Sequence, residues 1–173
     1  MKAKPRPSPQ YADFMARAYA IELEATERYA QFAEQLETHN NHEVAQLFRK
    51  LAHIESLHAR RILDEMQWPT MPAMPPAYAW ETPEAPETAP FDALHYLMQP
   101  YHALEIALRC EREAQKYYEN IAASRAPKQV RDAAREMAAD EAGHVSLIEE
   151  WMKRVPKPGP GWDEDPDPPR LND

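Results

Sequence analysis

The chain has 173 residues and carries 20 lysine and arginine side chains against 29 aspartate and glutamate side chains, for a formal net charge of −9. This acidic balance disfavours nucleic acid and anionic membranes as partners, and no apolar run approaches the roughly 20 residues that a membrane-spanning helix needs. Three glycines are too few for a turn-rich sheet fold, and a single cysteine excludes an internal disulfide. Together with the lack of an apolar segment after Met1, the cysteine usage predicts a cytoplasmic protein without a signal peptide.

The 18 prolines fall almost entirely near the two ends and in the middle of the chain. Because proline breaks helix interiors, these clusters predict the domain organisation. We expect an N-terminal arm over residues 1–11, a helical domain over 12–155 with a crossover linker at 67–90, and a tail over 156–173. The tail is acidic and proline-rich and has little to bury, which predicts an extended or disordered segment.

The first two predicted helices make up the N-terminal half of the domain. One runs from about Ala12 to Glu37 and the other from about His42 to Met66. In each, residues of one face recur in steps of three and four, as expected for a helix packed on a core. The face of the first helix carries Met15, Ala18, Glu22, Ala25, Tyr29, Phe32 and Leu36, and that of the second carries Val44, Leu47, Leu51, Glu55, His58 and Ile62.

The C-terminal half repeats this pattern. A third helix is predicted from Pro100, a favourable first-turn residue, to about Ser124, and a fourth from near Pro127 to near Val155. Residues 92–98 are predicted to form a short separate helix capped by Asp92. The face of the third helix carries Leu104, Ala107, Glu111, Ala114, Tyr118 and Ile121, and that of the fourth carries Val130, Ala134, Met137, Glu141, His144, Ile148 and Trp151.

Connection lengths predict the topology. Residues 38–41 and 125–126 are short connections, which favour two antiparallel helix hairpins. Residues 67–90 are long enough to run the length of a bundle, and their prolines would stiffen them. The sequence therefore predicts an all-α fold, a four-helix bundle in which two hairpins are joined by a long proline-rich crossover.

Two Glu-x-x-His motifs lie on these helix faces, Glu55 to His58 and Glu141 to His144. A further glutamate lies on the apolar face of the preceding helix in each case, Glu22 before the first motif and Glu111 before the second. Each of these glutamates is followed seven residues later by a tyrosine, Tyr29 or Tyr118. Glutamate and histidine three residues apart project from one face, one turn apart, so both can hold the same metal ion. The predicted ligands of a dinuclear metal centre are Glu22, Glu55, His58, Glu111, Glu141 and His144.

The position of these glutamates on apolar faces is the reason to expect metal. Four buried carboxylates repel one another and are costly to desolvate. Two divalent cations would neutralise their four negative charges, with two neutral imidazoles completing the ligand set. Carboxylate and imidazole ligation without thiolate suits iron or manganese, and zinc less specifically. The alternative is a set of buried salt bridges, but most of the neighbouring lysine and arginine residues fall off the apolar faces.

Three further residues are predicted to support the centre. Asp140 is placed to accept a hydrogen bond from the ring of a liganding histidine, most plausibly His58. Tyr29 and Tyr118 are predicted to face the centre and hydrogen-bond ligand carboxylates, with core packing as the alternative. Glu24 is the main rival to Glu22 as a ligand but lies on a different side of the helix.

Three segments resemble the ferritin-like superfamily. Residues 22–29, ELEATERY, look like the first ligand helix of bacterioferritin and rubrerythrin, and residues 140–144, DEAGH, are similar to the fourth-helix motif of bacterioferritin. Residues 107–118, ALRCEREAQKYY, resemble the rubrerythrin branch most. The resemblance implies a ferritin-like bundle with a di-iron centre that reacts with O2 or peroxide. The chain departs from rubrerythrin in two respects: it has no four-cysteine rubredoxin module, and Ala114 stands where rubrerythrin carries an additional glutamate.

Three functions are compatible with this pattern. The first is a peroxide- or O2-reducing di-iron enzyme of oxidative-stress defence, which uses an external electron-donor protein. The second is a ferroxidase or iron-handling protein of the ferritin type, and the third is a metal-stabilised structural or interaction protein. The expected cofactors are two iron ions, with manganese or a mixed iron–manganese pair as alternatives. We expect a homodimer or larger homo-oligomer.

Overall fold

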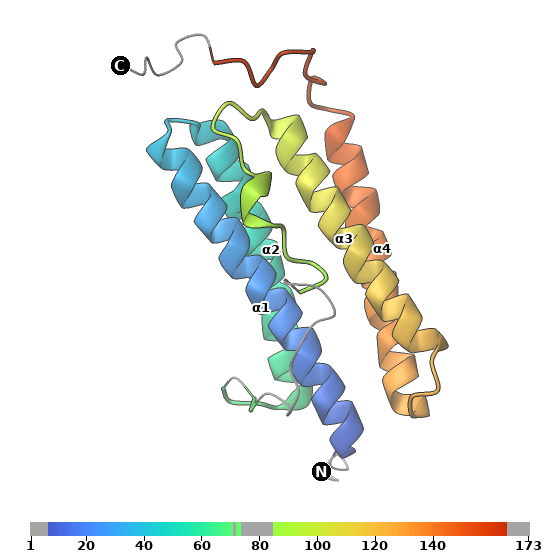
Figure 1. Cartoon of the computed structure of the whole chain (residues 1–173). Coiled ribbons are helices and arrows are strands. Elements are labelled where there is room, and N and C mark those ends of the chain that lie inside the picture. The colour runs from blue at the N-terminus through green and yellow to red at the C-terminus, as the bar shows by residue number, and fades with distance from the viewer. Residues whose placement is uncertain (1–6, 71, 74–84, 166–173) are drawn as a thin grey trace, which may run out of the picture.

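The computed structural model describes residues 7–70, 72–73 and 85–165, and their structure is an all-α, ferritin-like four-helix bundle (Figure 1). The elements are α1 (Pro9–Thr38), α2 (His42–Met66), the short 3-10 helix η1 (Phe91–Ala93), α3 (Pro100–Ala123) and α4 (Lys128–Met152). The four predicted long helices are confirmed to within a few residues at each end. No helix in the described part of the chain combines the length and apolar character that crossing a bilayer requires.

The helix ends follow from local chemistry. The Ser8 hydroxyl accepts a hydrogen bond from the Tyr11 amide at the start of α1, and the Asn41 side chain does the same for the Val44 amide at the start of α2. Such caps satisfy amides that the helix itself leaves unpaired. Gln67 adopts the left-handed conformation that ends α2.

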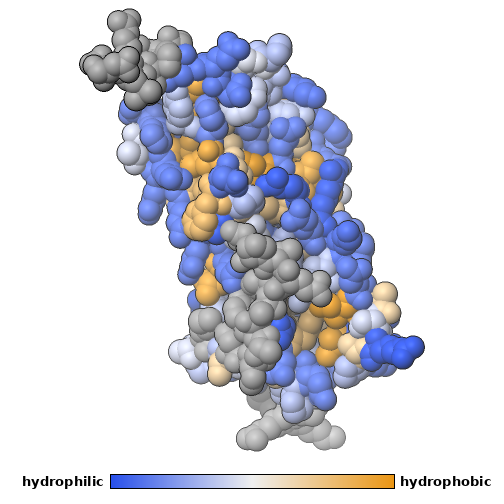
Figure 2. Space-filling model, viewed as in Figure 1, coloured by the Kyte–Doolittle hydropathy of each residue, from blue (hydrophilic) through white to orange (hydrophobic). Residues whose placement is uncertain are grey.

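The four helices form two antiparallel hairpins, α1 with α2 and α3 with α4, and the packing within each hairpin is much more extensive than that between them. The described part of the connection from α2 to α3, residues 85–99, runs between α1 and α3 toward the start of α3 (Figure 1). The predicted topology is therefore correct. Figure 2 shows a largely hydrophilic surface on this face of the molecule, interrupted by apolar patches.

The predicted short helix over residues 92–98 is wrong. Only the single turn η1 forms, and Asp92 lies inside it rather than capping it. The Asn41 side chain donates hydrogen bonds to the carbonyl oxygens of Tyr96 and Met98. These bonds tie the end of the segment to the start of α2.

The described part of the tail, up to Asp165, has no helix, but it is not without packing. Trp162 packs on one of the core clusters, and its ring centroid lies 3.7 Å from that of His102. The acidic, proline-rich tail therefore has one partly buried apolar side chain, that of Trp162. The remaining residues, 166–173, lie outside the described residues.

The core is divided into two apolar clusters, one toward each end of the bundle. The first contains Phe32, Leu36, Phe48, Leu104 and Ile148 among others. The second contains Phe14, Ile21, Ile62, Met137 and Val130 among others. In each of the four long helices, the core residues before the predicted metal ligands belong to one cluster and those after them belong to the other. The buried polar residues therefore form a layer between two apolar halves.

Candidate metal centre

All four helices contribute to the buried polar layer. Glu22 comes from α1, Glu55 and His58 from α2, Glu111 from α3, and Glu141 and His144 from α4. The four glutamates are buried, none more than 4% exposed. The two histidines lie nearer the surface, with side chains 17% and 20% exposed. The structure thus brings all six predicted ligands together at the middle of the bundle.

The six residues form two triads, and each triad belongs to one hairpin. Potential ligand atoms of Glu22, Glu55 and His58 lie within 4.8 Å of one another, as do those of the second triad, Glu111, Glu141 and His144. His58 Nδ1 is 3.1 Å from a Glu55 oxygen and 3.5 Å from a Glu22 oxygen.

The second triad has matching geometry. His144 Nδ1 is 3.1 Å from a Glu111 oxygen and 2.9 Å from a Glu141 oxygen. The rings of His58 and His144 stack nearly parallel, with centroids 4.4 Å apart. The two half-sites therefore face each other across the boundary between the hairpins.

A fifth carboxylate, Glu87, lies in the same layer and was missed by the sequence analysis. It is completely buried. Its carboxylate lies close to those of Glu22 and Glu141, and also close to those of Glu55 and Glu111. Glu87 belongs to the connection between the hairpins, not to a helix. Helical periodicity, the signal that identified the other ligands, could not place it.

The electrostatics of the metal-free layer reflect crowding. Burial raises the pKa of Glu22 to about 7 and that of Glu111 to about 8, although contacts with the histidines oppose the rise. Burial and four neighbouring carboxylates raise the pKa of Glu87 well above its ordinary value. Burial alone would lower the pKa of the histidines, but their glutamate contacts outweigh it and raise the pKa of His58 to about 9 and of His144 to about 11.

Several buried oxygens in this layer have no hydrogen-bond partner among the described residues. They are one oxygen of Glu22, both oxygens of Glu87, and the hydroxyls of Tyr29 and Tyr118. Buried polar atoms are normally paired, so the three unpaired carboxylate oxygens indicate that a cation belongs among them. Oxygen and imidazole donors in two adjacent triads fit a dinuclear iron site.

The salt-bridge alternative is not supported. Among the described residues, the ion pairs found for the four predicted glutamate ligands are with His58 and His144 rather than with lysine or arginine. Glu24 is only half-buried and is not in either triad.

Burial raises the pKa of the Cys110 thiol to about 12, so this cysteine is a packed, protonated side chain.

The predicted supporting residues lie near the layer but make other contacts. The Tyr29 and Tyr118 rings are completely buried; Tyr29 stacks on Phe48, and Tyr118 meets Phe14 edge to face. Their hydrogen bonds to carboxylates stay a prediction. The Asp140 carboxylate pairs with the Arg61 guanidinium of α2. The bond predicted from His58 to Asp140 is not among the contacts of the described residues.

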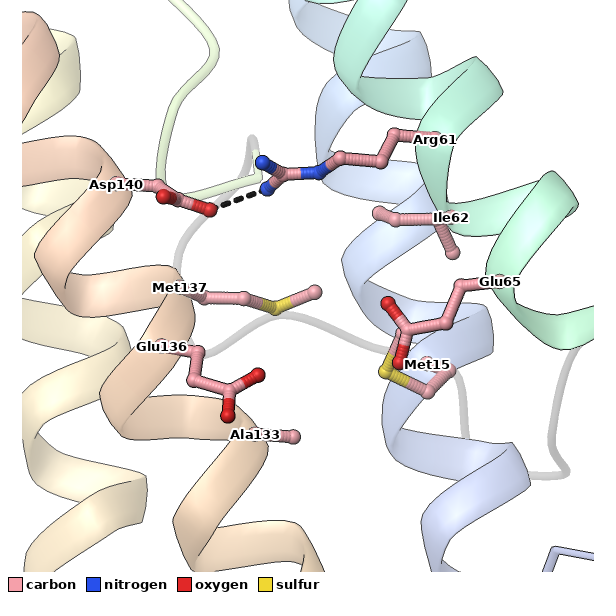
Figure 3. Close-up of a pocket in the computed structure, with 8 residues that line it drawn as sticks. All are labelled: Met15, Arg61, Ile62, Glu65, Ala133, Glu136, Met137 and Asp140. Carbon is pink, nitrogen blue, oxygen red and sulfur yellow. Dashed lines mark hydrogen bonds and ion pairs between the residues drawn. The ribbon is translucent and has the colours of Figure 1, made fainter.

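A polar pocket of about 350 Å³ adjoins the layer between α1, α2 and α4. Figure 3 shows Arg61 on α2 reaching toward Asp140 on α4, with the carboxylates of Glu65 and Glu136 facing the space below them. The methyl ends of Met15 and Met137 also point into it (Figure 3). Asp140 directly precedes the predicted ligand Glu141, so this pocket opens beside the centre.

A second opening reaches the ligands themselves. This crevice is much smaller, about 10 Å³, which is the room of roughly one water-sized molecule. It is lined by Leu51, Ile54, Leu147, Ile148 and Trp151 together with Glu55, Glu111 and His144, and its accessible surface is apolar. A small, weakly polar molecule could therefore enter from the α2 and α4 side.

The raised pKa values predict that metal binding releases protons. At pH 7 the metal-free protein holds protons on His58, His144 and mostly on Glu111, whose pKa values are about 9, 11 and 8. Metal must displace these protons, so affinity should rise from pH 7 to pH 9. Calorimetric titration at pH 7 in buffers of different ionisation enthalpy should show roughly three protons released per chain. Binding without proton release would contradict the assigned ligands.

Comparison with known proteins agrees with this geometry. The sequence model of the rubrerythrin family matches residues 13–71 and 102–159, which include all six predicted ligands. Among solved structures, the chain is similar to an uncharacterised conserved protein from Magnetospirillum magnetotacticum MS-1, with 36% sequence identity and a TM-score of 0.61. That similarity covers 86% of this chain and 97% of the other. No curated protein matched. Since the family model matches more than half of the residues, the chain belongs to the rubrerythrin family.

Proposed function

We propose that the protein is a dinuclear iron oxidoreductase that reduces hydrogen peroxide, or O2, with electrons from a separate donor protein. The observation that carries this proposal is the buried pair of Glu-Glu-His triads, each from one hairpin of a rubrerythrin-family bundle. Two ferrous ions held there would supply two electrons. One peroxide, two electrons and two protons give two water molecules, and the donor protein then restores the two electrons; reduction of one O2 to water would take four electrons and four protons.

The surrounding residues suit this chemistry. The two apolar clusters on either side of the layer exclude bulk water, which strengthens electrostatic interactions inside it. Burial raises the pKa of Tyr29 and Tyr118 well above ordinary values. Both phenols therefore keep their protons and can donate hydrogen bonds to ligand carboxylates. Manganese is the alternative metal, since its ligand preferences are similar.

The size of the crevice predicts substrate selectivity. Because it has room for about one water-sized molecule, we expect kcat/KM for hydrogen peroxide to exceed that for tert-butyl hydroperoxide at least tenfold. Leu147→Ala, which shortens a side chain of the wall, should reduce this ratio. Leu57→Ala is the matched control, because Leu57 is similarly exposed but is not part of the crevice. Equal use of both peroxides by the wild-type protein would contradict entry through this opening.

A turnover experiment tests the proposed function. The protein is loaded anaerobically with Fe(II), and hydrogen peroxide is added with a reduced viologen dye as the electron donor. We expect many peroxides reduced per chain, with iron remaining bound. Oxidation of many Fe(II) ions per chain without catalytic peroxide reduction would favour iron handling instead. No turnover in a fully loaded protein would favour a structural role for the metal.

A further inference from the structure

Glu87 is the one carboxylate in the polar layer that the helical repeat does not explain. It is completely buried, and neither of its oxygens has a hydrogen-bond partner among the described residues. It lies between the two segments matched by the rubrerythrin family model, so the family match does not account for it. A carboxylate in this situation needs a partner of positive charge.

The position of Glu87 points to that partner. Its carboxylate lies within 4.8 Å of ligand atoms of Glu22 and Glu141, one glutamate from each triad. It also lies within the same distance of Glu55 and Glu111, again one from each triad. A side chain that belongs to only one half-site would not group with both. Glu87 is therefore central to the pair.

We propose that Glu87 is a fifth carboxylate ligand of the dinuclear centre, shared by the two ions and delivered by the connection between the hairpins. This inference rests on the proposed dinuclear site. It assigns a ligand role to a residue outside the four helices, and it makes residues 85–90 a structural part of the centre. The buried, small side chain of Ala114, one turn after Glu111, is consistent with a carboxylate arriving from elsewhere.

The connection is built to hold Glu87 in place. Ala85, Thr88 and Ala89 are buried around it, and the Thr88 amide donates a hydrogen bond of 2.9 Å to the Ala85 carbonyl. The buried guanidinium of Arg28, on α1, donates to the Ala89 carbonyl and lies 3.4 Å from the centroid of the Phe91 ring. These contacts hold the backbone on both sides of Glu87 within the buried layer.

Charge balance predicts what a fifth carboxylate does. Four carboxylates balance two divalent ions, so a fifth leaves a negative charge that two trivalent ions would compensate better. Ionised Glu87 should therefore stabilise the oxidised pair relative to the reduced pair. Glu87→Gln removes this charge with little change in shape, and we expect the midpoint potential of the iron pair to rise.

The decisive comparison is metal binding by wild type, Glu87→Gln and Glu113→Gln. Glu113 is an exposed glutamate on α3, so its substitution is the charge-matched control. In anaerobic Fe(II) titrations, we expect Glu87→Gln to lose at least tenfold in affinity for one or both ions. Its Mössbauer spectrum should also differ from that of wild type, whereas Glu113→Gln should match wild type in both measurements.

The outcomes separate this inference from the proposed function. If wild type binds two ions and Glu87→Gln binds them with unchanged affinity, spectrum and potential, Glu87 is a packing residue and the inference is overturned, while the proposed function stands. If wild type does not bind two ions, both fail. Folding of the variant is checked by its metal-free melting temperature, which should be close to that of wild type, because burial raises the pKa of Glu87 well above its ordinary value and a glutamine has nearly the shape of the protonated carboxyl.

A second variant and a second measurement guard against indirect effects. Glu87→Asp keeps the charge but shortens the reach, so we expect an affinity between those of wild type and Glu87→Gln. Metal loading should also slow hydrogen exchange of the peptide containing residues 85–90 in wild type, and not in Glu87→Gln. Equal slowing in both proteins would show that the ions do not engage this segment through Glu87.

Discussion

Glu111→Ala should abolish tight binding of one ion and reduce turnover to background. Glu111 is 1% exposed and lies 3.1 Å from His144 Nδ1 within the second triad. Loss of groups that only support a ligand costs roughly 10- to 100-fold in metal affinity, and removal of a ligand should exceed that. Anaerobic Fe(II) titration and peroxide turnover measure both effects.

Two controls make this result specific. Glu113→Ala removes an exposed glutamate from the same helix, and Glu24→Ala removes the rival glutamate of α1; both should bind two ions as wild type does. The metal-free Glu111→Ala protein should remain folded, because burial raises the pKa of Glu111 to about 8 and Glu141 still pairs with His144. If Glu24→Ala lost the ions while Glu111→Ala retained them, the assigned ligand faces would be wrong.

Metal should raise the thermal stability of the wild-type protein by about 10 °C. A ligand that binds only the folded state stabilises it by roughly 4 kcal/mol when its free concentration is a thousand times its dissociation constant. For a chain of this size, each kcal/mol raises the melting temperature by roughly 2–4 °C. Melting curves with chelator and with Fe(II) or Mn(II) under anaerobic conditions provide the measurement.

This stabilisation should grow with pH. In the metal-free protein, His58 has a pKa raised from 6.5 to about 9, so its favourable contribution is complete below pH 6.5 and is lost as pH rises through 9. Glu22 and Glu111, with pKa values raised from 4.5 to about 7 and 8, become costly ions over the range from pH 4.5 to 8. Both effects weaken the metal-free state as pH rises, and bound metal removes them. Identical melting curves with and without metal at pH 8 would favour the alternative, in which protein groups or bound protons, and not metal ions, neutralise the buried carboxylates.

The helical part of the centre could be predicted from sequence because it obeys a period. Residues three, four and seven apart share a helix face, so the placement of Glu22 or His144 on an apolar face fixed both its burial and its neighbours. The duplicated order of ligands then indicated which helices pair. The positions of the six predicted ligands on the helices were accessible by this reasoning.

Most of what escaped prediction lies outside the helices, where no period operates. Glu87 and Trp162 occupy proline-rich segments, and their burial depends on tertiary contacts such as that between Arg28 and Ala89. The 92–98 segment has a plausible helix start, but the helix does not form, and the end of the segment is bonded to Asn41, which is distant in sequence. The partner of Asp140 was also not predictable, because it depends on which long side chain reaches the carboxylate. In the structure this side chain is Arg61.

The confinement of each triad to one hairpin has a consequence for how the protein folds. Contacts between neighbouring helices joined by short turns have low sequence separation, and such contacts form fast. α1 with α2 and α3 with α4 can each assemble early, and each would then already carry a complete Glu-Glu-His set. The slow event is the docking of two preformed halves across a long, proline-rich connection, where crowded carboxylates repel. Ions captured by the separate hairpins would remove that repulsion, so metal supply during synthesis should govern the rate of the last folding step.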